Sequence, residues 1–389
     1  MSKGAYLGVD GIARKVRKIY VGVDGVARKV KKGYIGVNGI AHKFFGGELR
    51  YYGTPATLSH VSLLPVGSAN SEYALFALVG WTIPNGMQYQ SVGNAFNKQF
   101  TRSELEIPWT VREGRGLATQ KHAFFAGGYA NNGGNVKTVI PYDTSLTQKT
   151  AADLLQGNVK TPAGAVVGDY ALFGGSENYV DSTIWRKVSV YHSTTLTQSE
   201  ASLTRTLFNV KGADNGTYAV FAGGGYKTSN GSSSATPSRT AVGFDESLTR
   251  VTATNLNSTT KPTLAVRAGD YAVFIGSSRS DAYDKNLTKV SGSALSLTRS
   301  SVTAVTLDQY GLCAGGRVPR SGKVSEYYTD VVDVYDASLT RQTITNLSLG
   351  RLPAGAVLGD YALFAGGKYY KTGTLVSTDT DVIDVYTVD

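Results

Sequence analysis

The sequence is poor in cysteine and histidine and has no long apolar run. Cys313 has no second thiol with which to form an internal disulfide, so nothing in the chain requires an oxidising compartment. No stretch of about 18 apolar residues occurs, and the opening residues 1–6 have no hydrophobic region. We therefore expect neither a membrane span nor a standard secretion signal.

Acidic residues are scarce only at the start of the chain. The formal net charge is +10, and residues 1–47 contain ten Lys or Arg against Asp10 and Asp24. The remainder carries 29 basic and 27 acidic residues, so it is nearly neutral. A basic protein often binds nucleic acid, but here the charge belongs to one short segment rather than to the whole chain.

A nine-residue phrase, Gly359 to Gly367 (GDYALFAGG), recurs along most of the sequence. Seven copies end at glycines separated by 48, 47, 49, 52, 40 and 51 residues. These glycines are Gly80, Gly128, Gly175, Gly224, Gly276, Gly316 and Gly367. A period near 50 residues is typical of β-propellers, so we predict an all-β fold with seven blades over residues 47–389.

The last copy indicates how a blade is built. Residues 342–347, 354–358, 361–365 and 381–386 each have the composition of a short strand, with Gly359-Asp360 as a tight turn. Most copies end in a Tyr-Asp-x-Ser-Leu-Thr phrase, in which the Asp side chain is expected to bond its own backbone. The last copy lacks the strand that follows this phrase elsewhere. We predict that residues 48–58 supply it by pairing beside residues 381–388, which closes the ring.

The order of hydrophobic strand, Gly-Gly pair, variable loop and Tyr-Asp phrase resembles the kelch family over about residues 48–389. The resemblance implies a kelch-like propeller. The chain departs from the kelch pattern where that family usually has Trp, because Leu or Phe stands there: Phe100, Leu146, Leu196, Leu248, Leu287 and Leu339.

A second repeat, of 14 residues, fills residues 5–44. Each of its three units places Asp-Gly or Asn-Gly between two short alternating runs, the strongest local signal for a β-hairpin. A hairpin of this length is marginal alone, so residues 1–46 are predicted to be a docking module. Its candidate docking residues are Arg14, Lys15, Arg28, Lys29 and Lys43. A protein partner is favoured over nucleic acid because no groove-reading fold accompanies the charge. The alternative is a solvated array whose lysines protect its edges.

The hairpin repeats resemble those preceding variable domains in structural proteins of bacteriophages and prophages of Gram-positive bacteria. The likeness covers about the first 45 residues. It implies a virion or phage-tail-like particle, with the hairpins docked into the particle and the propeller presented outward.

Catalytic residues are not evident. The repeated Asp169, Asp270, Asp308 and Asp360 are interpreted as turn residues rather than metal ligands. The histidines (His42, His60, His122, His192) have neither metal-type spacing nor a nucleophile partner, and Cys313 stands where other copies have Phe. Sialidase-like Asp boxes are missing, and Cys313 is poorly placed for the crosslink of a galactose-oxidase-like site. We therefore predict no enzyme activity, no cofactor and no metal.

The loops after the glycine pairs are rich in Tyr, Asn, Ser and Gly, a mixture typical of adaptable recognition surfaces. The candidate ligand-binding residues are Tyr129, Asn131, Tyr179, Trp185, Tyr226, Arg317, Tyr327, Tyr328, Tyr369 and Tyr370. The alternative is that several of these tyrosines only pack along blade edges.

These patterns predict a non-enzymatic component of a virion or phage-tail-like particle, assembled in multiple copies in the bacterial cytoplasm. Residues 1–46 would dock it to other particle proteins, and the propeller would bind a host-surface glycan or protein or decorate the particle. Two alternatives stay open: a kelch-type scaffold for cellular proteins and, ranked below it, a carbohydrate-active propeller enzyme.

Overall fold

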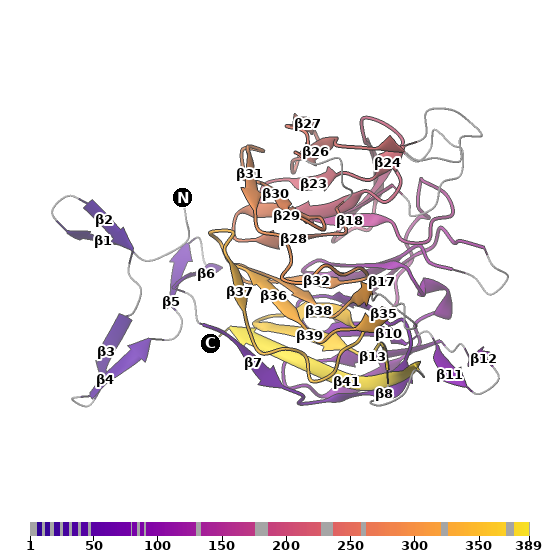
Figure 1. The fold of residues 1–389 in the computed structure, drawn as a ribbon, viewed down its shortest axis with the longest axis horizontal. Helices are drawn as coiled ribbons and strands as arrows, with labels where there is room; N and C mark the ends of the chain where they lie inside the picture. The colour runs from indigo at the N-terminus through magenta and orange to yellow at the C-terminus, as the bar shows by residue number, and fades with distance from the viewer. Residues whose placement is uncertain are drawn as a thin grey trace.

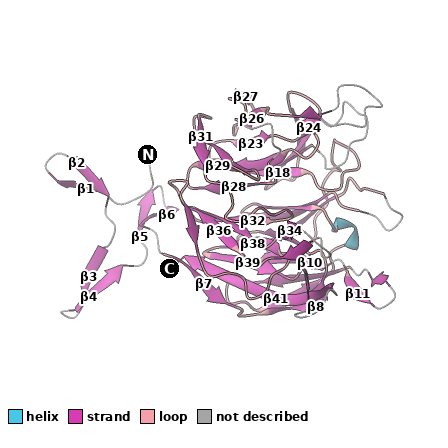
Figure 2. Ribbon diagram, viewed as in Figure 1, coloured by secondary structure: helices cyan, strands magenta, loops and turns pink. Residues whose placement is uncertain are grey.

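Figure 1 shows a computed structural model of the chain. The structure describes residues 6–9, 12–15, 19–23, 26–30, 33–37, 40–45, 48–78, 80–83, 86–88, 91–129, 134–175, 186–226, 236–257, 262–319, 326–370 and 377–388. Apart from one short 3₁₀ turn, η1 (Trp109–Val111), the regular structure of these residues is strand (Figure 2). The predicted all-β class is confirmed.

Three two-stranded antiparallel sheets precede the propeller, and Figure 1 draws them to one side of its body. They pair β1 (Tyr6–Val9) with β2 (Ile12–Lys15), β3 (Ile19–Val23) with β4 (Val26–Val30), and β5 (Gly33–Val37) with β6 (Ile40–Phe45). In each pair the register leaves two residues between the strands, as a hairpin requires. The Asp-Gly and Asn-Gly turns themselves lie outside the described residues.

Seven antiparallel sheets form the blades, and the predicted number is confirmed. From the innermost strand outward, the first three blades are β9 (Val66–Ala69), β10 (Ala74–Leu78), β13 (Val92–Phe96), β14 (Arg102–Leu105) in the first; β15 (Arg115–Ala118), β16 (His122–Ala126), β17 (Val139–Asp143) in the second; and β18 (Ala163–Val167), β19 (Tyr170–Gly174), β20 (Lys187–His192), β21 (Gln198–Ser202) in the third. The next two are β22 (Lys211–Asp214), β23 (Ala219–Ala222), β26 (Ala241–Phe244), β27 (Arg250–Ala253) in the fourth, and β28 (Leu264–Ala268), β29 (Tyr271–Ile275), β30 (Ser280–Tyr283), β31 (Lys289–Gly292) in the fifth. The last two are β32 (Thr303–Leu307), β33 (Tyr310–Ala314), β36 (Val332–Tyr335), β37 (Arg341–Thr343) in the sixth, and β38 (Ala354–Leu358), β39 (Tyr361–Ala365), β41 (Ser377–Val388), β7 (Leu49–Gly53) in the seventh.

Two details differ from the sequence prediction. Residues 342–347 are not the first strand of the last blade, because β37 ends at Thr343 and pairs with β36 of the sixth blade. The second blade has three strands among the described residues, and its outer edge is marked only by a bridge between Tyr142 and Gln148.

Seven clusters of buried apolar side chains hold the ring together, and each lies between two consecutive blades. One of them joins Phe76 and Phe96 of the first blade to Leu363 and Val385 of the last, so the ring is continuous. Burying apolar area between neighbouring sheets is the main favourable term for such a fold. Cys313 is a fully buried member of one cluster, in the place that Phe takes in other blades.

Residues near the N-terminus complete the last blade. β7 pairs antiparallel with the end of β41, from Leu49 opposite Val388 to Gly53 opposite Val385, and β8 (Thr57–Ser62) pairs with the beginning of β41. The Tyr51 hydroxyl donates a hydrogen bond of 2.6 Å to Asp384. This is the pairing that the sequence leads us to expect, and it leaves the seventh blade with a fourth strand.

The acidic residues of the repeat occupy hairpin turns. Gly168-Asp169, Gly269-Asp270 and Gly359-Asp360 are two-residue connections between the first and second strands of their blades, with the glycine at a φ of 50° to 58°. Asp308 holds the glycine's place in the sixth blade at a φ of 55°. The predicted turn role of these residues is confirmed.

Candidate functional site

Two sets of loops lie at one end of the propeller: those that precede each innermost strand and those that follow each second strand. Arg115, which begins an innermost strand, pairs with Ala126, and Gly127, Gly128 and Tyr129 follow directly. The same relation holds in the fourth blade, where Lys211 pairs with Ala222. We call this end the loop face, and the opposite end, which carries the two-residue Gly-Asp turns, the turn face.

Four blades carry a short two-stranded extension at the loop face. They are β11 (Trp81–Ile83) with β12 (Gly86–Gln88), β24 (Gly225–Tyr226) with β25 (Thr236–Pro237), β34 (Arg317–Pro319) with β35 (Glu326–Tyr328), and β40 (Lys368–Tyr370) with the beginning of β41. Figure 1 shows β11, β12 and β24 on the side of the propeller away from the N-terminal sheets. Backbone pairing in these extensions gives their main chains a defined path.

Two of the predicted ligand-binding tyrosines lie against each other. The rings of Tyr328 and Tyr370 are stacked with centroids 4.8 Å apart and planes 14° apart. They come from the extensions of the sixth and seventh blades, and both side chains keep part of their surface exposed. Tyr327 pairs with Val318 in the same extension, and Tyr369 bridges to Arg351.

Two further predicted tyrosines lie under arginine side chains. The guanidinium carbon of Arg205 lies 4.2 Å from the ring centroid of Tyr226, and that of Arg112 lies 4.6 Å from the ring of Tyr129. A guanidinium over an aromatic face contributes about 0.5–1 kcal/mol at exposed sites. The arginines therefore hold these rings in place, a role that the sequence pattern did not indicate.

Of the remaining predicted residues, the structure describes some and not others. Arg317 lies on the loop face and exchanges backbone hydrogen bonds with Ser300. Asn131, Tyr179 and Trp185 lie outside the described residues, as do the side chains of the docking residues, although Arg14, Lys15, Arg28, Lys29 and Lys43 fall within strands of the three N-terminal sheets.

A polar cavity at the propeller axis was not predicted. It has a volume of about 290 Å³ and opens among the beginnings of the innermost strands of the second to sixth blades. Its polar lining consists of Arg115, Thr161, Asn209, Lys211, Thr263 and Ser301. Among the described residues of its wall, Arg115 and Lys211 carry charge and no Asp or Glu is present. The signal available in the sequence was weak: in the second to sixth blades a polar residue stands within three positions before the second residue of the innermost strand, and in the first and seventh blades it does not.

Arg115 begins the innermost strand of the second blade and lines this cavity. Its Nε is buried and has no hydrogen-bond partner among the described residues. Burial lowers the pKa of its guanidinium from the ordinary value, although an arginine stays protonated at any physiological pH. Asn209 and Ser301, in equivalent positions before their strands, hold left-handed backbone conformations at φ 54° and 53°. Strained, non-glycine residues of this kind often accompany binding sites.

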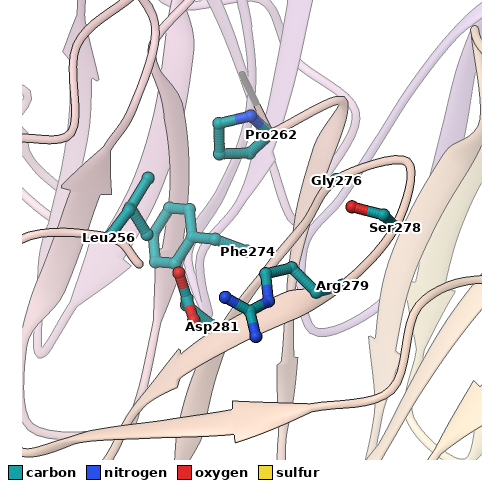
Figure 3. A pocket seen from close by; sticks show the side chains of 7 residues that line it. All are labelled: Leu256, Pro262, Phe274, Gly276, Ser278, Arg279 and Asp281. Atoms are coloured by element: carbon teal, nitrogen blue, oxygen red, sulfur yellow. The ribbon is translucent and has the colours of Figure 1, made fainter. Parts of the chain in front are cut away.

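A second hollow is much smaller (Figure 3). Its volume is about 10 Å³, about the space for one water molecule. The lining residues are Leu256, Pro262, Phe274, Gly276, Ser278, Arg279 and Asp281. The Asp281 carboxylate already accepts hydrogen bonds from the backbone and side chain of Asn257. We therefore do not take this hollow as a ligand site.

Reactive groups are buried or dispersed in the part of the chain that the structure describes. Burial raises the pKa of the Cys313 thiol far above its ordinary value, so this group is a poor nucleophile. No group of three or more His, Cys, Asp or Glu side chains among the described residues could hold a metal ion. Within the same residues, no helix is long and apolar enough to cross a membrane.

Comparisons with known proteins identify no family for the chain. No protein-family model matches the chain, and no curated protein matches it in sequence. Among solved structures, that of YjhT is similar, with a TM-score of 0.49 and 11% sequence identity over 87% of this chain and 99% of the other.

Proposed function

We propose that this chain is a binding protein of a virion or phage-tail-like particle, without enzymatic activity. The three N-terminal sheets attach it to other particle proteins, and the loop face binds a glycan or protein of the host surface. In this proposal the particle is assembled in the bacterial cytoplasm and carries several copies of the chain. The resemblance of the 14-residue repeats to phage structural proteins supports the particle, and the aromatic loop face supports the binding role.

The observation that carries the proposal is that the N-terminal sheets and the aromatic loops lie at opposite ends of the propeller. The chain enters the last blade at Leu49, which pairs with Val388, and the Val388 N–H donates a hydrogen bond of 3.2 Å to Asp360 in a Gly-Asp turn. The N-terminal sheets therefore join the propeller at the turn face. The Tyr328–Tyr370 stack lies at the opposite end, so attachment at one end leaves the loop face directed outward.

Two variants test the two halves of the proposal. Deleting residues 1–46 should abolish co-purification with assembled particles while leaving the propeller folded. Replacing Tyr328 and Tyr370 by Ala should leave particle association intact but reduce adsorption of particles to host cells about tenfold or more, because stacked tyrosines supply rigid contact area.

A matched control replaces Tyr52, an aromatic side chain that is 43% exposed near the turn face. Tyr52→Ser should not change adsorption. Unchanged particle association after deletion of residues 1–46 would contradict the attachment role, and adsorption that survives the double tyrosine change would contradict the role of the loop face.

A further inference from the structure

Backbone pairing holds the stacked rings of Tyr328 and Tyr370 from both sides. The Arg351 N–H donates a hydrogen bond of 3.2 Å to the carbonyl of Thr329, the residue after Tyr328. Arg351 also forms a β-bridge with Tyr369, the residue before Tyr370. Each ring therefore belongs to a residue next to one that pairs with Arg351. The main chain, and not ring contact alone, sets the distance between the two rings.

The arrangement of the two rings is suited to forming a covalent bond between them. Their centroids are 4.8 Å apart and their planes 14° apart, so the rings lie face to face in a stack. A phenol that loses one electron and its hydroxyl proton becomes a radical whose unpaired electron is shared by the oxygen and the ring carbons ortho and para to it. In tyrosine the para carbon carries the side chain, so two such radicals join through ortho carbons. Holding the rings in contact makes this joining step intramolecular, which favours it over the encounter of two dilute radicals.

Exposure and geometry distinguish this pair from Tyr51 and Tyr386. Tyr328 and Tyr370 both keep part of their surface exposed, so a small oxidant can reach the rings and water can accept the protons. The centroids of Tyr51 and Tyr386 are 5.2 Å apart, but their planes are inclined by 61°. Tyr386 is fully buried, its hydroxyl donates to the Thr345 carbonyl, and burial raises the pKa of this hydroxyl. Tyr386 therefore loses its proton with difficulty.

We infer that Tyr328 and Tyr370 are a site of oxidative cross-linking, in which a dityrosine bond joins the sixth blade to the seventh. Two equivalents of a one-electron oxidant, such as a peroxidase intermediate, take one electron from each phenol, and each hydroxyl proton leaves to water. A carbon–carbon bond then forms between one ortho carbon of each ring. Each of these carbons passes its hydrogen as a proton to the oxygen of its own ring, which restores both hydroxyls. The product has two hydrogens fewer than the starting protein.

This inference goes beyond the proposed function and does not rest on it. The bond fixes the extensions of the sixth and seventh blades relative to each other, whatever the loop face binds. The two ideas can fail separately. Loss of adsorption in the double alanine variant of Tyr328 and Tyr370 needs no cross-link, and a cross-link can form in a protein that binds no host surface.

Oxidation of the full chain in solution with a photoexcited ruthenium complex and persulfate tests the site. We expect a product of monomer size with two hydrogens fewer. After digestion with trypsin, peptide 324–341 should be joined to peptide 369–371. Dilution of the protein should not lower the share of this product, because the coupling is intramolecular. Absence of this cross-link under conditions that oxidise other tyrosines, or a cross-link only between chains, would overturn the inference.

Phenylalanine variants identify the residues, because Tyr327 and Tyr369 lie in the same two peptides. Tyr328→Phe and Tyr370→Phe keep an aromatic ring for the stack but lack the phenol, so each should lose the cross-link. Tyr327→Phe and Tyr369→Phe are the matched controls and should keep it. A cross-link that survives Tyr328→Phe, or one that is lost in Tyr327→Phe, would refute the assignment.

Thermal unfolding tests whether the fold holds the two rings ready to join. A bond between residues 328 and 370 closes a loop in the unfolded chain, so it stabilises the folded state unless it strains it. Oxidised wild type should therefore unfold at a higher temperature than Tyr328→Phe oxidised in the same way, which controls for oxidation elsewhere. An equal or lower unfolding temperature of the cross-linked wild type would show that the bond distorts the native stack, which contradicts the inference.

Discussion

One apolar residue in the outer turn of six blades, Leu in five and Phe in one, has a constrained backbone. Six side chains stand one residue before the final Thr of the closing phrase, and all have φ between 58° and 61°. They are Phe100, Leu146, Leu196, Leu248, Leu287 and Leu339. The left-handed conformation costs a non-glycine residue about 1–2 kcal/mol. Packing of each side chain against an interblade cluster offsets this cost, as for Leu287, which is only 5% exposed.

The aspartate of the same turn supplies the compensating hydrogen bonds. The Asp336 Oδ1 accepts from the backbone N–H groups of Ser338 and Thr340, at 2.9 Å and 3.1 Å. We expect Asp336→Ala to lower the free energy of unfolding by about 1–2 kcal/mol, because a carboxylate accepting two N–H groups is lost. Urea unfolding measures the change. Asp336→Asn keeps an acceptor and should cost less, and equal losses in both variants would contradict this account.

The equivalent Asp143 makes the fold sensitive to acid. Burial tends to raise its pKa, but Lys149 at 2.8 Å and the N–H groups of Thr147 and Ser145 outweigh that effect and lower the pKa below its ordinary value. The folded-state pKa is therefore below the unfolded one, so the contribution is present above about pH 4 and is lost as the pH falls further.

We expect the difference in unfolding free energy between the wild type and Asp143→Asn to shrink between about pH 6 and about pH 3. Thermal unfolding of both proteins across this range measures it. Asp143→Glu, which keeps the charge, serves as the control for loss of turn geometry. A difference that stays constant with pH would contradict the assignment.

At the scale of the strand, several blades share a buried polar pair. In the seventh blade Arg351 lies 2.7 Å from Asp384, and both side chains are fully buried. The Arg351 Nη2 also donates to the Phe364 carbonyl, at 2.9 Å. The sixth blade repeats the arrangement with Arg299 and Asp333. Each pair ties the loop before an innermost strand to the second and third strands of the same blade.

The third blade makes the same connection without charge. Gln156 donates to the Phe173 carbonyl, as the arginines do in their blades, and the Ser189 hydroxyl donates to Gln156 Oε1 at 2.5 Å. Ser189 stands opposite Phe173 in the sheet, as Asp384 stands opposite Phe364. The repeat therefore preserves the hydrogen-bonding geometry while it exchanges an ion pair for a neutral pair.

This equivalence predicts that a double variant is more stable than the sum of its two single changes would suggest. Arg351→Gln and Asp384→Ser should each lower the free energy of unfolding by about 3–5 kcal/mol, because each leaves a buried charge unpaired. The double variant copies the third blade and should cost less than the sum of the two by about 2 kcal/mol or more. Urea unfolding of all four proteins gives this coupling energy. Strict additivity would show that the two side chains do not act as a pair.

At the scale of the whole molecule, the ring depends on small residues at its axis. The second residue of each innermost strand pairs with the Phe of the repeated phrase, or with Cys313 in the sixth blade. These residues are Gly67, Gly116, Gly164, Gly212, Ala265, Ala304 and Gly355. A Cβ added at Gly116 would lie 1.8 Å from the backbone oxygen of Gly67, so the first and second blades approach too closely for any side chain.

Two alanine substitutions test this limit. Gly116→Ala should lower the free energy of unfolding by about 3 kcal/mol, because the backbone of the neighbouring blade has to move. In Gly164→Ala the atoms nearest to the new Cβ belong to the Leu117 side chain, at 2.8–3.0 Å, and the cost should be about 1 kcal/mol because this side chain can move. Thermal unfolding compares them. The opposite order would contradict the inference that backbone approach at Gly116 is tighter than the side-chain contact at Gly164.

The repeat made the architecture predictable, but not the site. Spacing of the glycines indicates blade number and strand order because each blade uses the same local pattern. The cavity around Arg115 could not be predicted in this way, because its wall comes from five blades and depends on how their strands meet at the axis. The polar pairs could not be predicted either, because Arg351 and Asp384 are far apart in sequence and become partners only across a folded blade.

The pairing of β7 with β41 has a consequence for synthesis on the ribosome. Tyr51 and its partner Asp384 are 333 residues apart, so β7 leaves the ribosome long before β41 exists. Until then β7 and β39 both lack their partner strand, so each presents an open edge to which another nascent chain could add a strand. The β7–β41 contact therefore forms late, and the interval before it is when a molecular chaperone would be of most use.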